Sequence, residues 1–227
     1  KRHTNREAYD MTKAVPADAV QDMADCMKPY PIRFGFVGLD QPDAIEKHRA
    51  IAAEAWRIEL TTPAKILETY RVLRVGAREI VKYRDGISIN DPFLSLLVRL
   101  GLFDRSKAPK PDDSAIVDQI EKFNKNLEST PGFLWMITEG NGRTVQVNAG
   151  RAYVRIQLLG TAHGVSMQPL QQALQEYPEQ QGPYEEIHTL LNSPSPRYTV
   201  QMWARLGYGP QIEPAPRRGL AAHIAES

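Results

Sequence analysis

The segment from 133 to 164 constrains the fold more than any other part of the chain. It begins with a compact apolar run, 133–138, which predicts a β-strand. Two interpretations fit the residues that follow. Asn141-Gly142 could form a hairpin turn into a return strand at 144–147, or 143–163 could form one amphipathic helix. The length of the segment favours the helix, so we expect a strand followed by a long helix.

Hydrophobic periodicity and capping residues predict the other elements. Apolar residues recur at spacings of three and four from Ile66 to Val81, behind Thr62-Pro63, and indicate one helix of about five turns. The remaining elements expected from the same signals are helices at 45–58, 93–100 and 116–127 and strands at 33–37 and 198–206. Together these predict one α+β domain.

Composition excludes several classes of protein. The 227 residues include 28 Lys+Arg and 27 Asp+Glu, a balance that does not favour a nucleic-acid partner. A single cysteine, Cys26, permits no internal disulfide and no CxxC metal site. Arg99 interrupts the longest apolar stretch, 93–102, so we expect no membrane span. The loop motifs of dinucleotide and nucleoside-triphosphate sites and the HExxH zinc motif are absent from the sequence.

A basic cluster at the beginning of the chain is the first candidate binding site. In an extended or turning segment, Arg2, Thr4 and Arg6 point to one side and can hold a phosphate. Arginine suits this role because its planar guanidinium donates two parallel hydrogen bonds to phosphate oxygens. The alternative interpretation is a solvated terminus.

Two further stretches are candidates for ligand contact. Small residues at 150, 152, 160 and 162 would let the helix approach another backbone or a flat ring closely; the alternative is a well-packed core helix. Pro216-Arg217-Arg218 adds basic residues to a proline-rich arm, which either contact a phosphate or form a solubilising tail.

The order of these stretches resembles that of the FMN-dependent nitroreductase family. Its basic-x-Ser/Thr-x-basic opening is similar to Arg2-His3-Thr4-Asn5-Arg6, and its strand and Gly-x-Ala helix are similar to 133–164. The closer resemblance is to the tandem branch, the Acg-type and Tat-signal-labelled proteins, mainly to the C-terminal half. The resemblance implies an α+β nitroreductase-like fold, a mostly antiparallel sheet flanked by helices. It also implies one domain over 1–227 with a helical insertion at about 40–102, possibly the C-terminal part of a longer tandem chain.

The resemblance further implies an FMN cofactor. The flavin carries the electron chemistry, so no side chain is expected to act as a catalytic acid or base and none to bind a metal. One departure concerns 27–34, where active relatives have an asparagine facing the flavin pyrimidine edge and this chain has none. The implied cofactor-binding residues are Arg2, His3, Thr4, Arg6, Gln157, Met167, Gln168, Pro169, Arg217 and Arg218.

Three functions are compatible with these residues. The first is an oxidoreductase that passes electrons from NAD(P)H to a small nitro- or quinone-type acceptor. The second is a family member that binds or sequesters FMN without turnover, and the third is an interaction protein without a cofactor. The resemblance implies that the partner is a second copy or a missing N-terminal half, and which of the two applies depends on what preceded Lys1. The expected location is the cytoplasm, or the periplasm if a signal segment preceded Lys1.

Overall fold

The computed structural model describes residues 4–213 and 215–224. Their contacts divide the chain into two units, one formed within 1–59 and 117–212 and the other within 60–116 and 213–227. The helices are α1 (Ala17–Asp25), α2 (Pro42–Thr61), α3 (Pro63–Val72), α4 (Gly76–Tyr83), α5 (Pro92–Arg99), α6 (Ser114–Glu128), α7 (Arg143–Ala162) and α8 (Gln181–Leu190), with short 3-10 helices at Gln172–Leu174, Pro178–Gln180 and Leu220–His223. The strands are β1 (Ile32–Gly38), β2 (Leu73–Val75), β3 (Ile87–Ile89), β4 (Gly132–Glu139), β5 (Ser166–Pro169) and β6 (Tyr198–Gly207).

The first unit contains a four-stranded sheet in the order β1-β4-β6-β5. Every neighbouring pair in it is antiparallel. The three strands expected from sequence, at 33–37, 133–138 and 198–206, are therefore confirmed and lie side by side as β1, β4 and β6. The α+β class with a mostly antiparallel sheet is confirmed as well.

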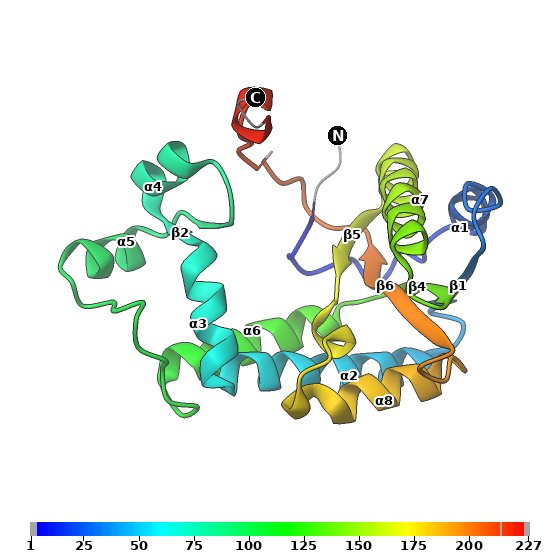
Figure 1. The fold of residues 1–227 in the computed structure, drawn as a ribbon, viewed down its shortest axis with the longest axis horizontal. Helices are drawn as coiled ribbons and strands as arrows, with labels where there is room; N and C mark the ends of the chain where they lie inside the picture. The colour runs from blue at the N-terminus through cyan, green and yellow to red at the C-terminus, as the bar shows by residue number, and fades with distance from the viewer. Residues whose placement is uncertain (1–3, 214, 225–227) are drawn as a thin grey trace. The chain divides into compact units, whose positions relative to one another are not determined.

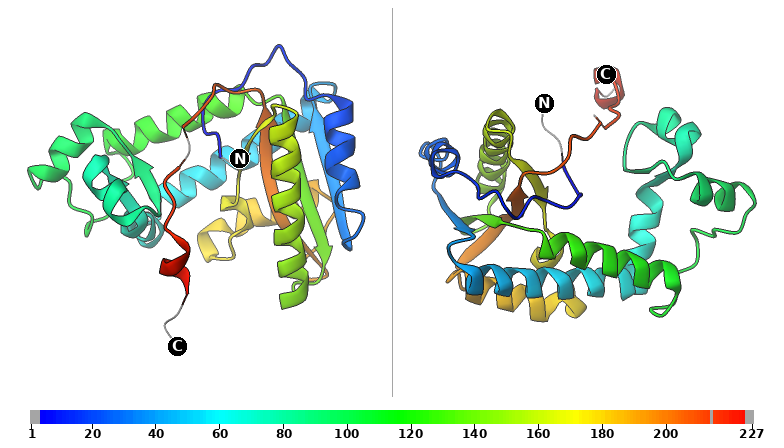
Figure 2. Two further views of the ribbon diagram at one scale, coloured as in Figure 1. Left: turned by 90° about the horizontal axis from the view of Figure 1, so that it is seen from above. Right: turned by 180° about the vertical axis from the view of Figure 1, so that it is seen from behind.

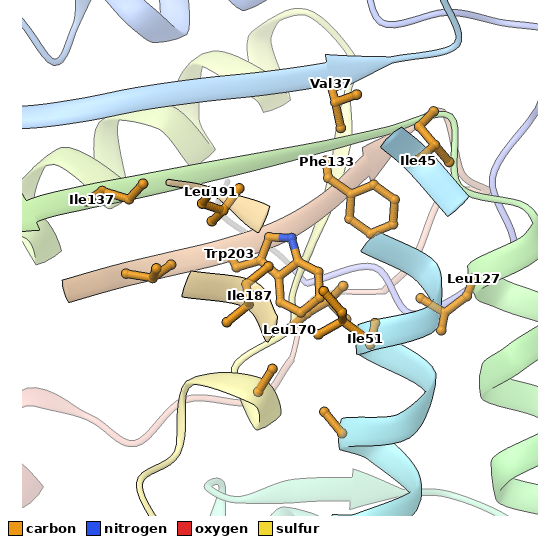
Figure 3. Packing of buried hydrophobic residues seen from close by; sticks show 14 of the residues in the cluster. Val37, Ile45, Ile51, Leu127, Phe133, Ile137, Leu170, Ile187, Leu191 and Trp203 are labelled. Carbon is orange, nitrogen blue, oxygen red and sulfur yellow. The ribbon is translucent and has the colours of Figure 1, made fainter. Parts of the chain in front are cut away.

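Helices cover both faces of this sheet, because side chains alternate between the faces along each strand. Phe133, Ile137 and Trp203 point into a buried cluster with residues of α2 and α8 (Figure 3). Leu134 and Leu206 point into the opposite cluster, which α1 and α7 complete. Figure 1 and Figure 2 show α7 running along one face of the sheet while α2 and α8 lie across the other. The first unit is thus a three-layer arrangement with two separate cores.

The ambiguous segment after β4 is helical. Residues 143–162 form α7, and Gly164 follows it with φ of +71°, a left-handed conformation that ends a helix readily. Because α7 buries Ala152 and Ile156 against the sheet, tertiary packing adds to the preference that length alone indicates. The hairpin interpretation with a return strand at 144–147 is wrong.

The long helix expected from Ile66 to Val81 is also wrong in part, since the structure divides it. Helix α3 ends at Val72, β2 follows, and α4 begins at Gly76. Gly76 has φ of +75°, which interrupts the helical hydrogen bonds. The intervening β2 pairs in parallel with β3, so a contact with residues beyond the helix overrides its local periodicity. The second unit contains this small β2-β3 sheet together with α3, α4 and α5.

The predicted helices at 45–58, 93–100 and 116–127 correspond to α2, α5 and α6. At the start of α5, the Asp91 side chain accepts a hydrogen bond from the Leu94 N–H at 2.6 Å, the contact expected of an N-cap. Among the described residues, none of the helices combines the length and the hydropathy that crossing a bilayer requires.

A buried histidine lies in the core below the sheet. The His48 ring stacks on Phe133 at 5.0 Å and on Trp135 at 5.3 Å between ring centroids. Its Nδ1 accepts a hydrogen bond from Trp203 Nε1 at 3.0 Å, which requires Nδ1 to be unprotonated. Burial among these rings lowers the pKa of His48 from 6.5 to about 4. His48 is therefore a neutral core residue at physiological pH.

Candidate functional site

The candidate site is built around the N-terminal segment, by which we mean residues 4–10. It is tied to β5 by the Asn5 N–H, which donates to the Met167 carbonyl oxygen at 3.1 Å. Further along, the Asp10 N–H donates to the Tyr208 carbonyl oxygen at 2.8 Å. The segment thus runs beside both β5 and the residues that follow β6, although these parts lie more than 150 positions away in the sequence.

Asn5 holds the segment in place. Its side chain is fully buried, and its Nδ2 donates to Ser166 Oγ at 3.1 Å and to the Pro210 carbonyl oxygen at 2.9 Å. Its Oδ1 accepts from the Glu7 N–H at 3.0 Å. A Cβ at Gly209 would lie 2.7 Å from Asn5 Nδ2, so only glycine at 209 permits this close approach. The sequence alone indicated neither the anchoring role of Asn5 nor the need for glycine at 209.

The neighbours of Asn5 face the other way. Thr4 is half-buried and Arg6 is exposed, whereas Asn5 between them is fully buried. This burial pattern fits an alternating segment in which residues 4 and 6 share the side opposite to residue 5. The main chain at Arg6 is fixed, because Asn126 Nδ2 donates to the Arg6 carbonyl oxygen at 2.7 Å. Arg2 and His3, the other cofactor-binding candidates here, lie outside the described residues.

Arg205 connects the segment to the sheet and to α6. Its guanidinium is fully buried and donates from Nη2 to the Glu7 carbonyl oxygen at 2.7 Å and from Nη1 to the Asn126 carbonyl oxygen at 2.8 Å. It also lies 4.1 Å from the centroid of the Tyr9 ring. Among the described residues it forms no ion pair with a carboxylate. The charge is compensated by carbonyl dipoles, since Asn126 belongs to the last turn of α6, where the helix dipole is negative and the carbonyl accepts hydrogen bonds from side chains, here also from the Ser129 and Thr130 hydroxyls.

Gln168 is the third partner of Arg205. Residues 168 and 205 face each other across the β5-β6 pair, and Arg205 Nε donates to Gln168 Oε1 at 2.6 Å. This charge-assisted bond fixes the orientation of the amide, because Oε1 must face the guanidinium. The amide Nε2 of Gln168 is left without a partner among the described residues. It can donate to a ligand beside β5.

Gln157 contributes an acceptor from α7. Its Nε2 donates to the Tyr153 hydroxyl at 2.7 Å, while its Oε1 is buried without a partner among the described residues. Tyr153 belongs to the same buried cluster as Met167 of β5, whose carbonyl meets Asn5, and the Tyr9 hydroxyl donates to the Asn5 carbonyl oxygen at 2.8 Å. Burial is the main cause that raises the pKa of Tyr9, and the nearby Arg205 opposes it. Gln157 therefore belongs to the same polar neighbourhood as the N-terminal segment.

The remaining predicted residues occupy other environments. The Met167 side chain is buried between the sheet and α7, so its main-chain carbonyl is the group that meets the N-terminal segment. Pro169 ends β5 opposite Ala204. Arg217 and Arg218 belong to the second unit, where Arg218 Nη1 lies 3.7 Å from Asp85 Oδ2. The structure thus brings Thr4, Arg6, Met167 and Gln168 together around one segment.

Neither a protein-family model nor any curated protein matches the chain. Solved structures do match it. The FMN- and NADPH-dependent nitroreductase NfnB from a Sphingopyxis strain superposes with a TM-score of 0.56 at 18% identity, covering 100% of this chain and 95% of that one. The FMN-dependent nitroreductase NfnB from Mycobacterium smegmatis, solved with NADPH, gives 0.55 at 17% identity, with 100% and 94% covered.

A solved structure of another kind of enzyme also matches the chain. Iodotyrosine deiodinase, solved with FMN and 3-iodo-L-tyrosine, gives a TM-score of 0.51 at 15% identity and covers 96% of this chain and 91% of that one. At such identities the likeness describes the fold. The expectation made from sequence is confirmed at this level: the chain has the nitroreductase-like fold.

Proposed function

We propose that this protein is a flavoprotein that binds FMN beside β5 and the N-terminal segment. The single observation that carries the proposal is the unpaired set of polar groups in that place. Gln157 Oε1 is a buried acceptor without a partner, and the Gln168 amide nitrogen is a donor without one among the described residues. FMN supplies complementary groups, because its ribityl hydroxyls donate and its ring accepts. The residues present therefore fit the cofactor.

Different residues of the chain would bind different parts of FMN. Thr4 would donate its hydroxyl to the phosphate, and Arg6, with Arg2, would neutralise its charge. Gln168, held by Arg205, would donate to the ring or the ribityl chain. Arg217 and Arg218 belong to the second unit and have no part in this proposed site. When bound, FMN supplies the capacity to accept hydride and to pass electrons on.

We further propose NAD(P)H as the electron donor and a nitro- or quinone-type compound as the acceptor. The solved relatives named above support the donor, since NADPH appears in the names of two of them. One observation favours the non-catalytic alternative. No asparagine is present in 27–34, where Met27 is buried in the core and β1 begins at Ile32. Anaerobic bleaching of bound flavin by NADPH separates the two, because a protein that only sequesters FMN stays oxidised.

The binding proposal makes a direct prediction about the phosphate contact. Arg2→Ala combined with Arg6→Ala should weaken FMN at least tenfold, because each charge-assisted phosphate bond contributes about 1.5–3 kcal/mol. The loss should be larger at low ionic strength. Quenching of FMN fluorescence measures the dissociation constant. Lys28→Ala is the matched control, since Lys28 is an exposed cation of the first unit that pairs with Asp25. A dissociation constant that is the same in all three proteins would contradict the proposal.

We also propose that a second copy covers α7. Val147, Val154 and Leu158 are spaced by seven and four residues and lie on one helical face, with 48%, 42% and 49% of their surface exposed. A stripe of this kind is typical of a helix that packs against a partner.

Leu158→Glu should therefore convert a dimer to a monomer at micromolar concentration, because it places a charge in the apolar contact. Sedimentation velocity measures the change in mass. Val117→Glu serves as the control, since Val117 is an exposed apolar residue of α6, 38% accessible. Equal sedimentation of both variants and the parent protein would refute the α7 interface.

A further inference from the structure

A second candidate site lies wholly within the second unit. A cavity of about 620 Å³ is lined by residues of α3, β2, α4 and the loop after α5. Three of its lining residues are arginines, Arg71, Arg74 and Arg105, and one is a carboxylate, Glu79. None of these residues takes part in the proposed FMN site. The excess of positive charge in one concave place predicts an anionic ligand.

Two of the arginines converge on one atom. Arg74 Nη1 and Arg105 Nη1 donate to the same Leu73 carbonyl oxygen, at 3.3 Å and 3.4 Å. Each guanidinium is also held by a carboxylate: Arg74 by Asp85 at 2.8 Å, and Arg105 by Glu79 at 3.0 Å and 3.1 Å. These contacts place both groups before any ligand arrives, which lowers the entropic cost of binding.

Arg71 supplies charge without a counter-ion. Its side chain is exposed, and it forms no ion pair among the described residues. With Arg218, whose Nη1 lies 3.7 Å from Asp85 Oδ2, four guanidinium groups meet two carboxylates, Glu79 and Asp85, so the cluster keeps an excess of positive charge. Since the Arg71 carbonyl oxygen accepts from Arg74 Nη1 at 2.9 Å, the main chain of Arg71 is fixed next to the other two arginines.

The cavity also has aromatic surface. Tyr70 and Tyr83 line it, and the Arg74 guanidinium lies 4.7 Å from the centroid of the Tyr83 ring. A volume of about 620 Å³ falls within the range of about 300–1,000 Å³ that is typical of sites for small organic ligands. It is far larger than an inorganic anion needs. The ligand should therefore carry a planar ring as well as a negative charge.

We infer that this cavity binds a nucleoside monophosphate, with the phosphate on Arg71 and Arg105 and the base against the tyrosine side chains. Guanidinium groups suit phosphate because they present paired donors to its oxygens. The aromatic rings favour a base over an aliphatic substituent because rings stack at offset geometry.

The test is a calorimetric titration of the full chain with adenosine monophosphate, adenosine and inorganic phosphate, all without free FMN. We expect the monophosphate to bind at least tenfold more tightly than either fragment. Arg71→Ala should weaken it about tenfold, whereas Lys107→Ala, which removes an exposed cation of the same unit, should not. Arg6→Ala should leave monophosphate binding unchanged, because Arg6 belongs to the proposed FMN site.

Several results would overturn the inference. Binding of the monophosphate no tighter than that of inorganic phosphate would exclude a role for the rings. Equal affinity in the parent protein and Arg71→Ala would exclude the arginine cluster, and Arg71 is exposed, so the variant is expected to fold. A loss of monophosphate binding in Arg6→Ala would place the ligand at the other site.

Discussion

Replacing Arg205 with methionine is expected to lower the free energy of unfolding by about 3–5 kcal/mol. Methionine fills much of the space but donates no hydrogen bond. The Glu7 carbonyl oxygen and the Oε1 of Gln168 would then lose their buried partner, whereas the Asn126 carbonyl oxygen would keep the Ser129 and Thr130 hydroxyls. Each unsatisfied buried acceptor costs about 1–3 kcal/mol, and the N-terminal segment would lose one of its attachments. Urea denaturation measures the change.

The matched control is Arg197→Met. Arg197 precedes β6 directly, has 69% of its side chain exposed and pairs with the equally exposed Glu139. Such surface pairs contribute about 0–1 kcal/mol, so this variant should be nearly as stable as the parent. Arg205→Lys should fall between the two, because an ammonium retains the charge but cannot reach three separated acceptors in the same plane. Equal midpoints for Arg205→Met and Arg197→Met would refute the role of Arg205.

Acidification from pH 8 to pH 5 is expected to cost about 2 kcal/mol of stability through His48 alone. Burial lowers the pKa of His48 to about 4 in the folded protein, against 6.5 in the unfolded chain. Between these values the unfolded state binds more protons, so stability rises with pH. The contribution is complete above pH 6.5 and is lost as the pH falls toward 4.

The variant His48→Gln isolates this effect. Glutamine keeps an acceptor for the Trp203 N–H but does not titrate. Chemical denaturation at half-unit intervals between pH 5 and 8 should give a shallower slope of unfolding free energy for the variant than for the parent. Identical slopes would show that His48 is not buried in its neutral form.

The sheet of the first unit could be predicted from sequence because each strand carries its own signal. The alternation in 198–206 and the apolar run in 133–138 identify β6 and β4 within one residue at each end. The division of the long helix at Gly76 could not be predicted. The apolar spacing continues through 73–77, and β2 exists because it pairs with β3, a contact that local periodicity does not encode.

The sequence predicts the candidate binding side chains of the site. It does not predict the buried contacts that hold them in place. The spacing of Thr4 and Arg6 predicts that both lie on one side of an extended segment. The burial of Asn5 between them agrees with this prediction. Nothing local indicates that Asn5 contacts Ser166 and Pro210, or that Arg205 is buried rather than exposed. In the alternation of β6, Arg205 follows Trp203 on the same side, and only the helices that cover both faces show that this side is interior.

Because β5 is an edge strand, the N-terminal segment has a second effect besides its place in the candidate site. β5 lies at one end of the strand order, so its outer side has main-chain groups without a neighbouring strand. Exposed edges of this kind invite pairing between molecules and aggregation. The bond from Asn5 to the Met167 carbonyl occupies one of these groups, and Pro169 has no N–H to offer there. The segment that carries Thr4 and Arg6 thus also covers part of this sheet edge through Asn5, so a change that detaches it should expose the edge to other chains as well as disturb the proposed ligand site.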